Sequence, residues 1–573
     1  MTGPVQPHSP APEARPVGNR EHGFVAPAGP LQGRANRTPP PLSVVNGRVF
    51  TADPRRPFAE AVGMRDGLIA AVGSSSEVLS ALPDAEVIDA GGRSVLPGLI
   101  DAHNHFLATG ESLGTLDVRF PGVASLGELL ATLEEAAKAA PVGAYVHAHG
   151  YDDAKYERAP TRADLDRAAP SNPLLVGHVS GHYVAANSLA MASMGVADET
   201  PDPPGGELVR DGSGRPTGVF RDAAMELVQP TAVDVGHHGP NFHLKVPIDR
   251  LVTAVERAGR AFVAAGLTTV CDAQVTSREL AAYEQARAEG RLALRTVCMP
   301  LSSQLETYES VGISGPLGDE WLSIGAMKFY CDGSLIGGTA AFTTPYGENG
   351  ELAGYLFWEP EQFEEAIERA HRSGWQIGVH AQGDRAIEVV LRAFERAQQT
   401  RRVDDPRFRI EHAGFPTPPQ LRRMAALGVI AVCQPSYLKD SGDDFLVRLG
   451  KRAQRLQPLR EALRSGVKVV LSSDSDVASY RPLETMAAAV CRQTLSGRPI
   501  GTDQALTIAE AITAHTISAA WALRAEDRLG SIETGKLADV VVVGGDLFSA
   551  APTEIAGLPI DLTVIGGCLA HRQ

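Results

Sequence analysis

Short apolar runs alternate with amphipathic helical patterns over most of the chain. Helical patterns, such as those over 360–373 and 418–426, separate most of the runs. Repeated βα units of this kind predict an α/β protein with a TIM-type (β/α)8 barrel, whose catalytic groups gather at the C-terminal ends of its strands. Eight runs are expected to form its strands: 99–105, 267–272, 294–299, 324–330, 376–380, 408–412, 429–433 and 467–474.

Shorter β patterns with turn residues flank this region at both ends of the chain. Residues 43–50 contain Asn46-Gly47 and residues 60–73 contain Asp66-Gly67, dipeptides typical of tight hairpins. Similar runs recur after residue 530. We expect a small antiparallel unit from each end, and one β-sandwich assembled from both. The predicted division is 42–96 and 526–573 for the sandwich and 97–525 for the barrel.

About 160 residues, 107–266, separate the first and second barrel strands. They contain helical patterns at 126–140 and 247–265 and strand-like runs at 144–149 and 173–180. Because so long a structureless connection would be unusual, we expect an inserted subdomain that acts as a lid and sets substrate selectivity. Residues 1–41 are rich in Pro, Gly and Arg and are predicted to be a disordered or loosely wrapped tail.

Composition narrows the class of protein. The net charge is −15, from 53 basic and 68 acidic residues, and no basic cluster is long enough to suggest a nucleic-acid partner. No apolar run is long enough for a membrane span, and the N-terminus has no apolar core typical of a secretion signal. The six cysteines include no Cys-x-x-Cys pair, which favours reduced thiols and a cytoplasmic location.

Potential metal ligands stand at the ends of five of the predicted strands. They are His103, His105, Lys328, His380, His412 and Asp474. Side chains alternate along a strand, so the two residues of His-x-His point to one side and can grip one ion. An isolated His-x-His could equally contain a strand cap and a core residue, but the coincidence with the other strand ends favours a metal site.

Imidazole and carboxylate ligands suit zinc or a similar divalent ion, which lowers the pKa of a bound water towards ~7. Asp474 is predicted to be both a ligand and the general base. The ammonium group of Lys328 could join such a site only after losing its proton, or after carboxylation to a bridging carbamate.

The chain resembles the amidohydrolase superfamily, and more narrowly its amidohydrolase-3, YtcJ-like group, which includes N-substituted formamide deformylases. The stretches that carry the resemblance are 97–105, 328–334, 380–384, 411–413, 473–476 and 535–539. The resemblance implies that His103, His105 and Asp474 hold the more buried metal. It also implies that His380 and His412 hold a second ion, with carboxylated Lys328 bridging the two. The alternative is an unmodified lysine paired with Asp474 or Asp332.

Further candidates lie near the predicted site. His182, in a Gly-His…Asn stretch similar to the same group, is predicted to steady the developing oxyanion, or alternatively to cap the following helix. Glu411 precedes His412, so strand alternation should turn it away from the site. Asp272 and Asp332 could orient the histidines. His178, His147 and His149 are weaker metal candidates. Predicted substrate contacts are Tyr151, Tyr330 and Tyr346; Phe342 and Tyr437 could also wall the pocket.

These patterns predict a metal-dependent hydrolase that acts on carbon–nitrogen bonds other than peptide bonds. The expected substrate is a linear amide, and within that class an N-substituted formamide. A metal-bound hydroxide is expected to attack it while Asp474 shuttles the proton to the leaving amine. Cyclic amides, carbamates or esters are the alternative substrates, and an inactive regulatory barrel is the alternative class. One or two divalent ions, expected to be zinc, are implied, with N6-carboxylation of Lys328 as an option. A small-molecule amide is the expected partner, and a homodimer is left open.

Overall fold

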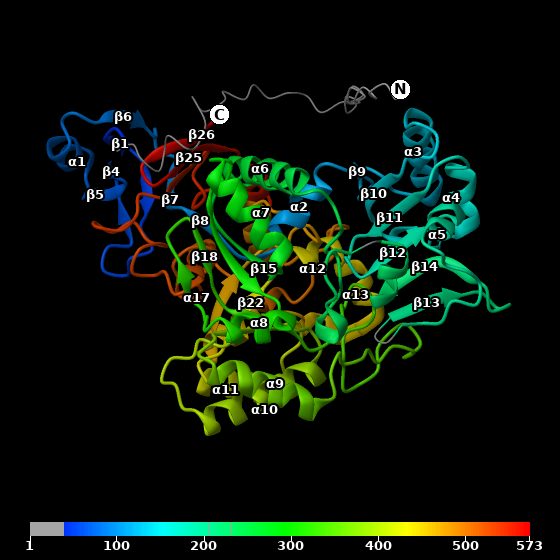
Figure 1. Ribbon diagram of the computed structural model, residues 1–573. Helices are drawn as coiled ribbons and strands as arrows, with labels where there is room; N and C mark the ends of the chain where they lie inside the picture. Colours follow the sequence, from blue (N-terminus) through cyan, green and yellow to red (C-terminus); the bar gives the residue numbers. More distant parts are fainter. Residues whose placement is uncertain (1–38, 157, 204–205, 230) are drawn as a thin grey trace, which may run out of the picture.

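Two five-stranded sheets form the centre of the molecule in the computed structural model, which describes residues 39–156, 158–203, 206–229 and 231–573 (Figure 1). The first sheet contains, in order, β17 (Leu317–Gly318), β18 (Leu322–Ile324), β16 (Arg295–Pro300), β15 (Leu267–Val275) and β8 (Leu99–Asn104). The second contains β19 (Met327–Tyr330), β20 (Ile377–Ala381), β21 (Arg409–His412), β22 (Ile430–Cys433) and β23 (Lys468–Leu471). Except for β17, neighbouring strands are parallel, so their C-terminal ends lie on one side of each sheet.

The two sheets touch at both pairs of edges. Leu301, just after β16, forms a parallel bridge with Lys328 of β19. At the other edge the backbone N–H of Asp474, just after β23, donates to the carbonyl of His103 at 2.9 Å. Every run predicted as a strand forms one, but the fourth is divided into β18 and β19. The division lies at Gly325, where an added Cβ would come within 2.7 Å of the Val297 side chain.

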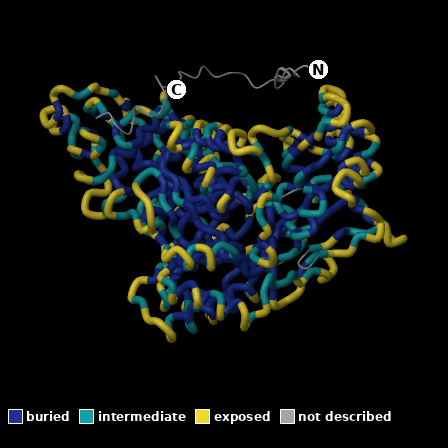
Figure 2. Tube along the Cα trace, viewed as in Figure 1, coloured by how far each residue is buried: buried dark blue, intermediate teal, exposed yellow. Residues whose placement is uncertain are grey.

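Helices cover these sheets, and residues buried against the centre alternate along them with exposed ones (Figures 1 and 2). Helices α9 (Pro360–Arg372) and α11 (Pro418–Ala426) confirm the expected helical patterns there. Both begin with proline at the first helical position, where a missing N–H costs nothing, and Thr417 and Gln420 cap α11 reciprocally. Helix α10 (Asp384–Thr400) packs beside α9. None of the helices within the described ranges is both long and apolar enough to cross a membrane.

Strands from both chain ends share one sheet. Its order is β26 (Cys568–Arg572), β25 (Ile560–Ile565), β24 (Val540–Val543), β7 (Ser94–Pro97), β2 (Arg48–Phe50) and β3 (Phe58–Ala59). A second sheet contains β5 (Leu68–Gly73), β4 (Ala61–Arg65), β1 (Leu42–Val45) and β6 (Glu86–Asp89). Valines and leucines of both sheets pack into one core.

The turn predictions for this region had different outcomes. Asp66-Gly67 joins the antiparallel strands β4 and β5, with positive φ at both residues, as a tight hairpin requires. The Asn46-Gly47 hairpin is wrong, because β1 and β2 lie in different sheets. The expectation of a purely antiparallel unit is also wrong, since β1 pairs in parallel with β6, and β2 with β7. Tertiary pairing has overridden the local turn preference.

The segment after β8 forms a six-stranded sheet of its own, at the right of Figure 1. Its order is β13 (Gly206–Arg210), β14 (Pro216–Asp222), β12 (Tyr183–Ala186), β11 (Leu174–His178), β10 (Val146–Tyr151) and β9 (Leu116–Asp117). Helices α3 (Leu126–Ala139), α4 (Arg162–Ala168) and α5 (Ser188–Ser193) accompany it, and α6 (Ile248–Ala264) leads back to β15. Of the tail predicted for residues 1–41, residues 1–38 lie outside the part of the chain that the structure describes.

Candidate metal centre

Three predicted ligands converge at the C-terminal ends of β8 and β23. Nε2 of His103 and Nε2 of His105 each lie 3.2 Å from Oδ1 of Asp474, and all three side chains are buried. His103 is the last residue but one of β8, and His105 is the N-cap of α2 (Phe106–Ser112). As expected for His-x-His, both imidazoles face the same carboxylate oxygen.

Asp474 and His412 reach the site from left-handed backbone conformations. Their φ values are 54° and 73°, which non-glycine residues adopt rarely. Such conformations concentrate at functional sites, where the surrounding structure holds them. Burial favours the neutral form of Asp474, but the two imidazoles outweigh it and hold its pKa well below the usual range.

His380 and His412 form the other side of the site. Their ring centroids are 4.3 Å apart, and the ring of His103 lies 5.0 Å from that of His412. Nε2 of His380 lies 3.0 Å from the carbonyl of Gly333, and Nδ1 of His412 lies 2.9 Å from Oε1 of Gln434. Each ring therefore keeps its other nitrogen for a metal. Burial lowers the pKa of His380 well below its usual value and that of His412 to about 3, so both rings are neutral, as ligation requires.

Lys328 is completely buried beneath these rings. Its Nζ lies 4.5 Å from the ring centroid of Tyr330, and burial lowers its pKa to about 8. Among the described residues, Nζ has no hydrogen-bond partner, and no ion pair joins it to Asp474 or Asp332. The expected alternative, an unmodified lysine paired with one of these carboxylates, therefore finds no support in the geometry.

Unsatisfied polar atoms test whether a metal ion fits here. Nζ of Lys328, Nε2 of His103 and Oδ1 of Asp474 are buried without a hydrogen-bond partner in the part of the chain that the structure describes. Burying polar groups in this way is costly unless something pairs with them. The donor atoms of His103, His105 and Asp474 all lie within 4.8 Å of one another. Nitrogen and oxygen donors so arranged fit a divalent ion.

Glu411 contacts the site, contrary to the prediction that it turns away. Its Oε2 lies 2.6 Å from Nδ1 of His103, and Arg409 donates to both of its carboxylate oxygens. Burial opposes the charged form, but Arg409 and His103 lower the pKa of Glu411 far below its usual range. Alternation along β21 does point Glu411 inward, and the left-handed turn at His412 then brings the next residue to the same region. An Arg-x-Glu pair within a buried strand was the sequence signal for this contact.

Asp332 and Asp272, the two carboxylates expected to orient histidines, contact other groups instead. Asp332 accepts backbone N–H groups of Gln382, Gly383 and Ala341, and its Oδ1 lies 3.7 Å from Nε2 of His380. Burial raises the pKa of Asp332 to about 7. Asp272 accepts the hydroxyl of Tyr283. Both residues thus fix the loops that follow the strands, and neither hydrogen-bonds a predicted histidine ligand.

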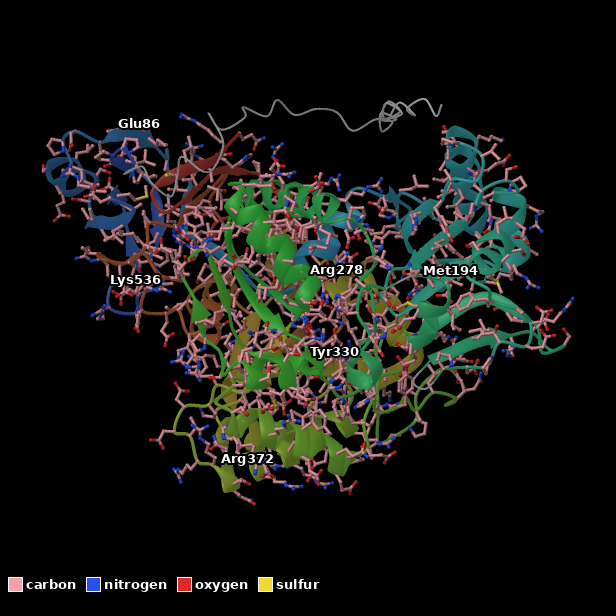
Figure 3. The ribbon with its side chains drawn as sticks, viewed as in Figure 1. Glu86, Met194, Arg278, Tyr330, Arg372 and Lys536 are labelled. Carbon is pink, nitrogen blue, oxygen red and sulfur yellow. The ribbon has the colours of Figure 1, made fainter. Side chains whose placement is uncertain are left out.

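A cavity of about 180 Å³ opens over the candidate ligands. It is bounded by His105, His380, His412 and Asp474 on one side and by the inserted segment on the other. Tyr330, labelled near the centre of Figure 3, lines it, as does Tyr437, whose hydroxyl donates to Oδ2 of Asp474.

The prediction that Tyr151 and Tyr346 contact the substrate is not supported, because neither residue lines this cavity. Tyr151, the last residue of β10, packs in the core of the inserted segment, and the hydroxyl of Tyr346 donates to the carbonyl of Ala340. Phe342 packs beside Tyr346 and also lies outside the lining. Both tyrosines are almost fully buried, so packing accounts for them.

His182 lines the cavity from the inserted segment, where it does not cap a helix; that cap is Asn187. Nδ1 of His182 lies 2.6 Å from Oδ1 of Asp222, and the hydroxyl of Tyr355 donates to the other oxygen of Asp222. The sequence analysis missed Asp222 and Tyr355. The only signal was that Asp222 ends a strand-like run, as the predicted metal ligands do.

The weaker histidine candidates also line the cavity, at its outer part. Nε2 of His149 lies 3.4 Å from Asp476, and His147 stacks on Tyr145. Within the described ranges, neither belongs to a donor cluster tight enough for an ion. His178 lies 3.1 Å from Asp153, and with Asp152 these residues form a second tight donor cluster.

The fold and the site together define a member of a known class: the chain belongs to the amidohydrolase family, whose model matches residues 86–571. The N-substituted formamide deformylase of Arthrobacter pascens is 32% identical over 93% of this chain and 98% of its own length. The putative amidohydrolase YtcJ of Bacillus subtilis is 28% identical over 92% of this chain and 98% of its own. In structure, the chain is similar to an uncharacterized metal-dependent hydrolase from Pyrococcus horikoshii, with a TM-score of 0.72 and 24% identity over 90% of this chain and 99% of the other.

Proposed function

We propose that this protein is a metal-dependent hydrolase that cleaves the C–N bond of a linear amide, with an N-substituted formamide as the favoured substrate. The observation that carries the proposal is the buried cluster of His103, His105 and Asp474, whose ligand atoms face one another. Nε2 of His103 and Oδ1 of Asp474 have no hydrogen-bond partner among the residues that the structure describes. The similarity to a formamide deformylase over nearly the whole chain supports the choice of substrate class.

The two central sheets are, in this proposal, halves of one (β/α)8 barrel, since they touch at both edges. His103, His105 and Asp474 would hold one zinc ion, and His380 and His412 a second. Lys328, buried and unpartnered among the described residues, would bridge them as its carbamate. Zinc supplies a water of lowered pKa and polarises the substrate carbonyl.

The chain's own residues supply binding and proton transfer. Asp474 takes the proton of the attacking water, and Tyr437 holds its other carboxylate oxygen. Tyr330, with its hydroxyl fixed on Oε1 of Gln274 at 2.5 Å, presents a rigid wall to the substrate. His182 faces the site across the cavity.

Charge in the cavity favours neutral or cationic amides. Glu111 and Asp476 line it together with the candidate ligands, and among the described lining residues there is no Lys or Arg to pair with an anionic substrate. A cavity of about 180 Å³ suits a small acyl group and a modest amine.

The test is a substrate panel with the purified, zinc-loaded protein. It contains N-alkyl and N-benzyl formamides, the matching acetamides, lactams, carbamates and esters. The proposal predicts the highest kcat/KM for an N-substituted formamide. A preference for lactams or carbamates would replace the linear amide as substrate class. No turnover of any member, with zinc bound at the site, would contradict the enzymatic function itself.

A further inference from the structure

His182 and Asp222 stand opposite each other where two antiparallel strands end. In the register of β12 and β14, Tyr183 pairs with Arg221, so His182 and Asp222 form the next cross-strand position. The backbone N–H of Asp222 donates to the carbonyl of His182 at 2.9 Å. The pair is therefore fixed by the sheet of the inserted segment and not by the strands that carry the candidate metal ligands.

Their side chains form a chain of hydrogen bonds that ends in the cavity. Oδ1 of Asp222 lies 2.6 Å from Nδ1 of His182, and the Tyr355 hydroxyl donates to Oδ2. The side chains of His182 and Asp222 are only 7% and 2% exposed. A carboxylate held in this way accepts a hydrogen bond from Nδ1 and so fixes the orientation of the ring. Nε2 is then the nitrogen that His182 presents to the cavity.

The backbone of Asp222 supports a functional reading of this pair. Its φ and ψ are 48° and −124°, a conformation that L-residues rarely adopt, and Asp222 directly precedes a 3-10 turn. A glycine would relieve this strain, but the carboxylate of Asp222 offers one acceptor oxygen to His182 and the other to Tyr355. Strained residues of this kind are characteristic of sites where side-chain placement matters.

His182 also lies close to the candidate metal centre without belonging to it. Its ring centroid is 6.5 Å from that of His380, and both residues line the cavity. Asp474 is already engaged: Oδ1 faces two imidazoles and Oδ2 accepts the hydroxyl of Tyr437. An amide substrate needs one group to take a proton from water and another to give a proton to the departing nitrogen.

We propose that His182 is the proton donor to the leaving amine and that Asp222 and Tyr355 are positioning residues for it. This inference rests on the proposed amide hydrolysis and replaces the oxyanion role expected for His182. When the C–N bond of the tetrahedral adduct breaks, its electron pair stays on nitrogen, which takes the proton from Nε2. His182 is left neutral and recovers a proton equivalent to the one released by the attacking water. The sum is amide plus water to carboxylic acid plus amine.

The proposal can be tested by comparing substrates that differ in their leaving group. An alkylamine must be protonated to leave, whereas 4-nitrophenolate leaves without a proton, so two substrates with the same acyl group separate the roles. We expect His182→Gln to lower kcat about 100-fold on the N-alkylamide and less than about threefold on the 4-nitrophenyl ester. Asp222→Asn and Tyr355→Phe should show the same selectivity with smaller losses. Tyr355→Phe keeps the ring and removes only the hydroxyl, so it tests the arrangement even if another variant fails to fold.

His237→Gln is the control, because it makes the same substitution at an exposed histidine that does not line the cavity. It should change the amide-to-ester ratio of kcat less than about threefold. Equal losses on both substrates in His182→Gln would overturn the proton-donor role, since an oxyanion contact or a packing defect affects both. Full amide activity in that variant would overturn it as well. Failure of the wild-type protein on both substrates would instead contradict the proposed function.

Discussion

Oε2 of Glu411 lies 2.6 Å from Nδ1 of His103, and neither side chain has any exposed surface. Arg409, equally buried, holds the other carboxylate oxygen at 2.7 Å and also donates to the carbonyl of Ala102. The contact fixes the proton of His103 on Nδ1 and directs Nε2 towards Asp474. A carboxylate behind a metal-binding histidine is a recurrent way to orient the ring and raise its basicity.

Replacing Glu411 should therefore weaken metal binding. Glu411→Gln keeps the shape but loses the charge, and we expect zinc affinity to fall about 10- to 100-fold. Competition with a chromogenic chelator measures it. Glu395→Gln, in a more exposed pair with Arg423, is the control and should leave affinity unchanged. Equal affinities for the wild type and Glu411→Gln would show that the carboxylate does not act through His103.

Metal removal should destabilise the fold as well as abolish activity. Without an ion, Lys328, His103 and Asp474 each keep a buried polar atom that finds no hydrogen-bond partner in the described part of the chain. Bound zinc at 100 times its dissociation constant stabilises the native state by about 2.7 kcal/mol. We expect dialysis against a chelator to lower the thermal midpoint and added zinc to restore it. Magnesium, which prefers all-oxygen ligands, serves as the control ion. A midpoint that zinc does not move would argue against a site built into the fold.

A buried ion pair ties the C-terminal strands to the central sheet. Arg295 of β16 donates from Nε and Nη2 to the two oxygens of Asp539, at 2.9 and 3.1 Å. Asp539→Ala leaves a buried guanidinium without this partner and should lower the free energy of unfolding by about 3–5 kcal/mol. The double variant Arg295→Met with Asp539→Leu should recover most of the loss. Asp404→Asn, in a fully exposed pair, should change stability by less than about 0.5 kcal/mol. A small loss in Asp539→Ala would contradict this account.

His515 should make stability depend on pH. Burial lowers its folded pKa from 6.5 to about 4. The unfolded chain therefore binds the proton first, so this contribution is complete above pH 6.5 and is lost as the pH falls towards 4. Between pH 7 and pH 5 the loss should be about 2 kcal/mol. His515→Asn, whose amide nitrogen can replace Nδ1 opposite the carbonyl of Ile100, should remove this part of the dependence. Thermal midpoints across that range measure it; parallel curves for the two proteins would contradict the assignment.

Most of the correct predictions came from the periodicity of the strands and from the residue types at the strand ends. They located the strands of both central sheets and brought His103, His105 and Asp474 together. These patterns gave wrong predictions where tertiary contacts outweighed a local sequence preference. The left-handed turn at His412 cancelled the alternation argument for Glu411, and sheet pairing overrode the Asn46-Gly47 turn.

Other parts of the site had no local pattern to predict them. Asp222 and Tyr355 lie 40 and 173 positions after His182, and only the folded sheet and a loop crossing bring them together. The same limit applies to the aromatic wall. No sequence pattern separates Tyr437 from Tyr151, yet Tyr437 lines the cavity and Tyr151 packs in the core of the inserted segment.

Anomalous diffraction from a crystal of the zinc-loaded protein would locate the bound ions. We expect peaks at the zinc absorption edge in contact with His103, His105 and Asp474 and with His380 and His412, and added density on Nζ of Lys328 between them. Saturating zinc with no anomalous peak at His103, His105 and Asp474 would contradict the proposed metal centre.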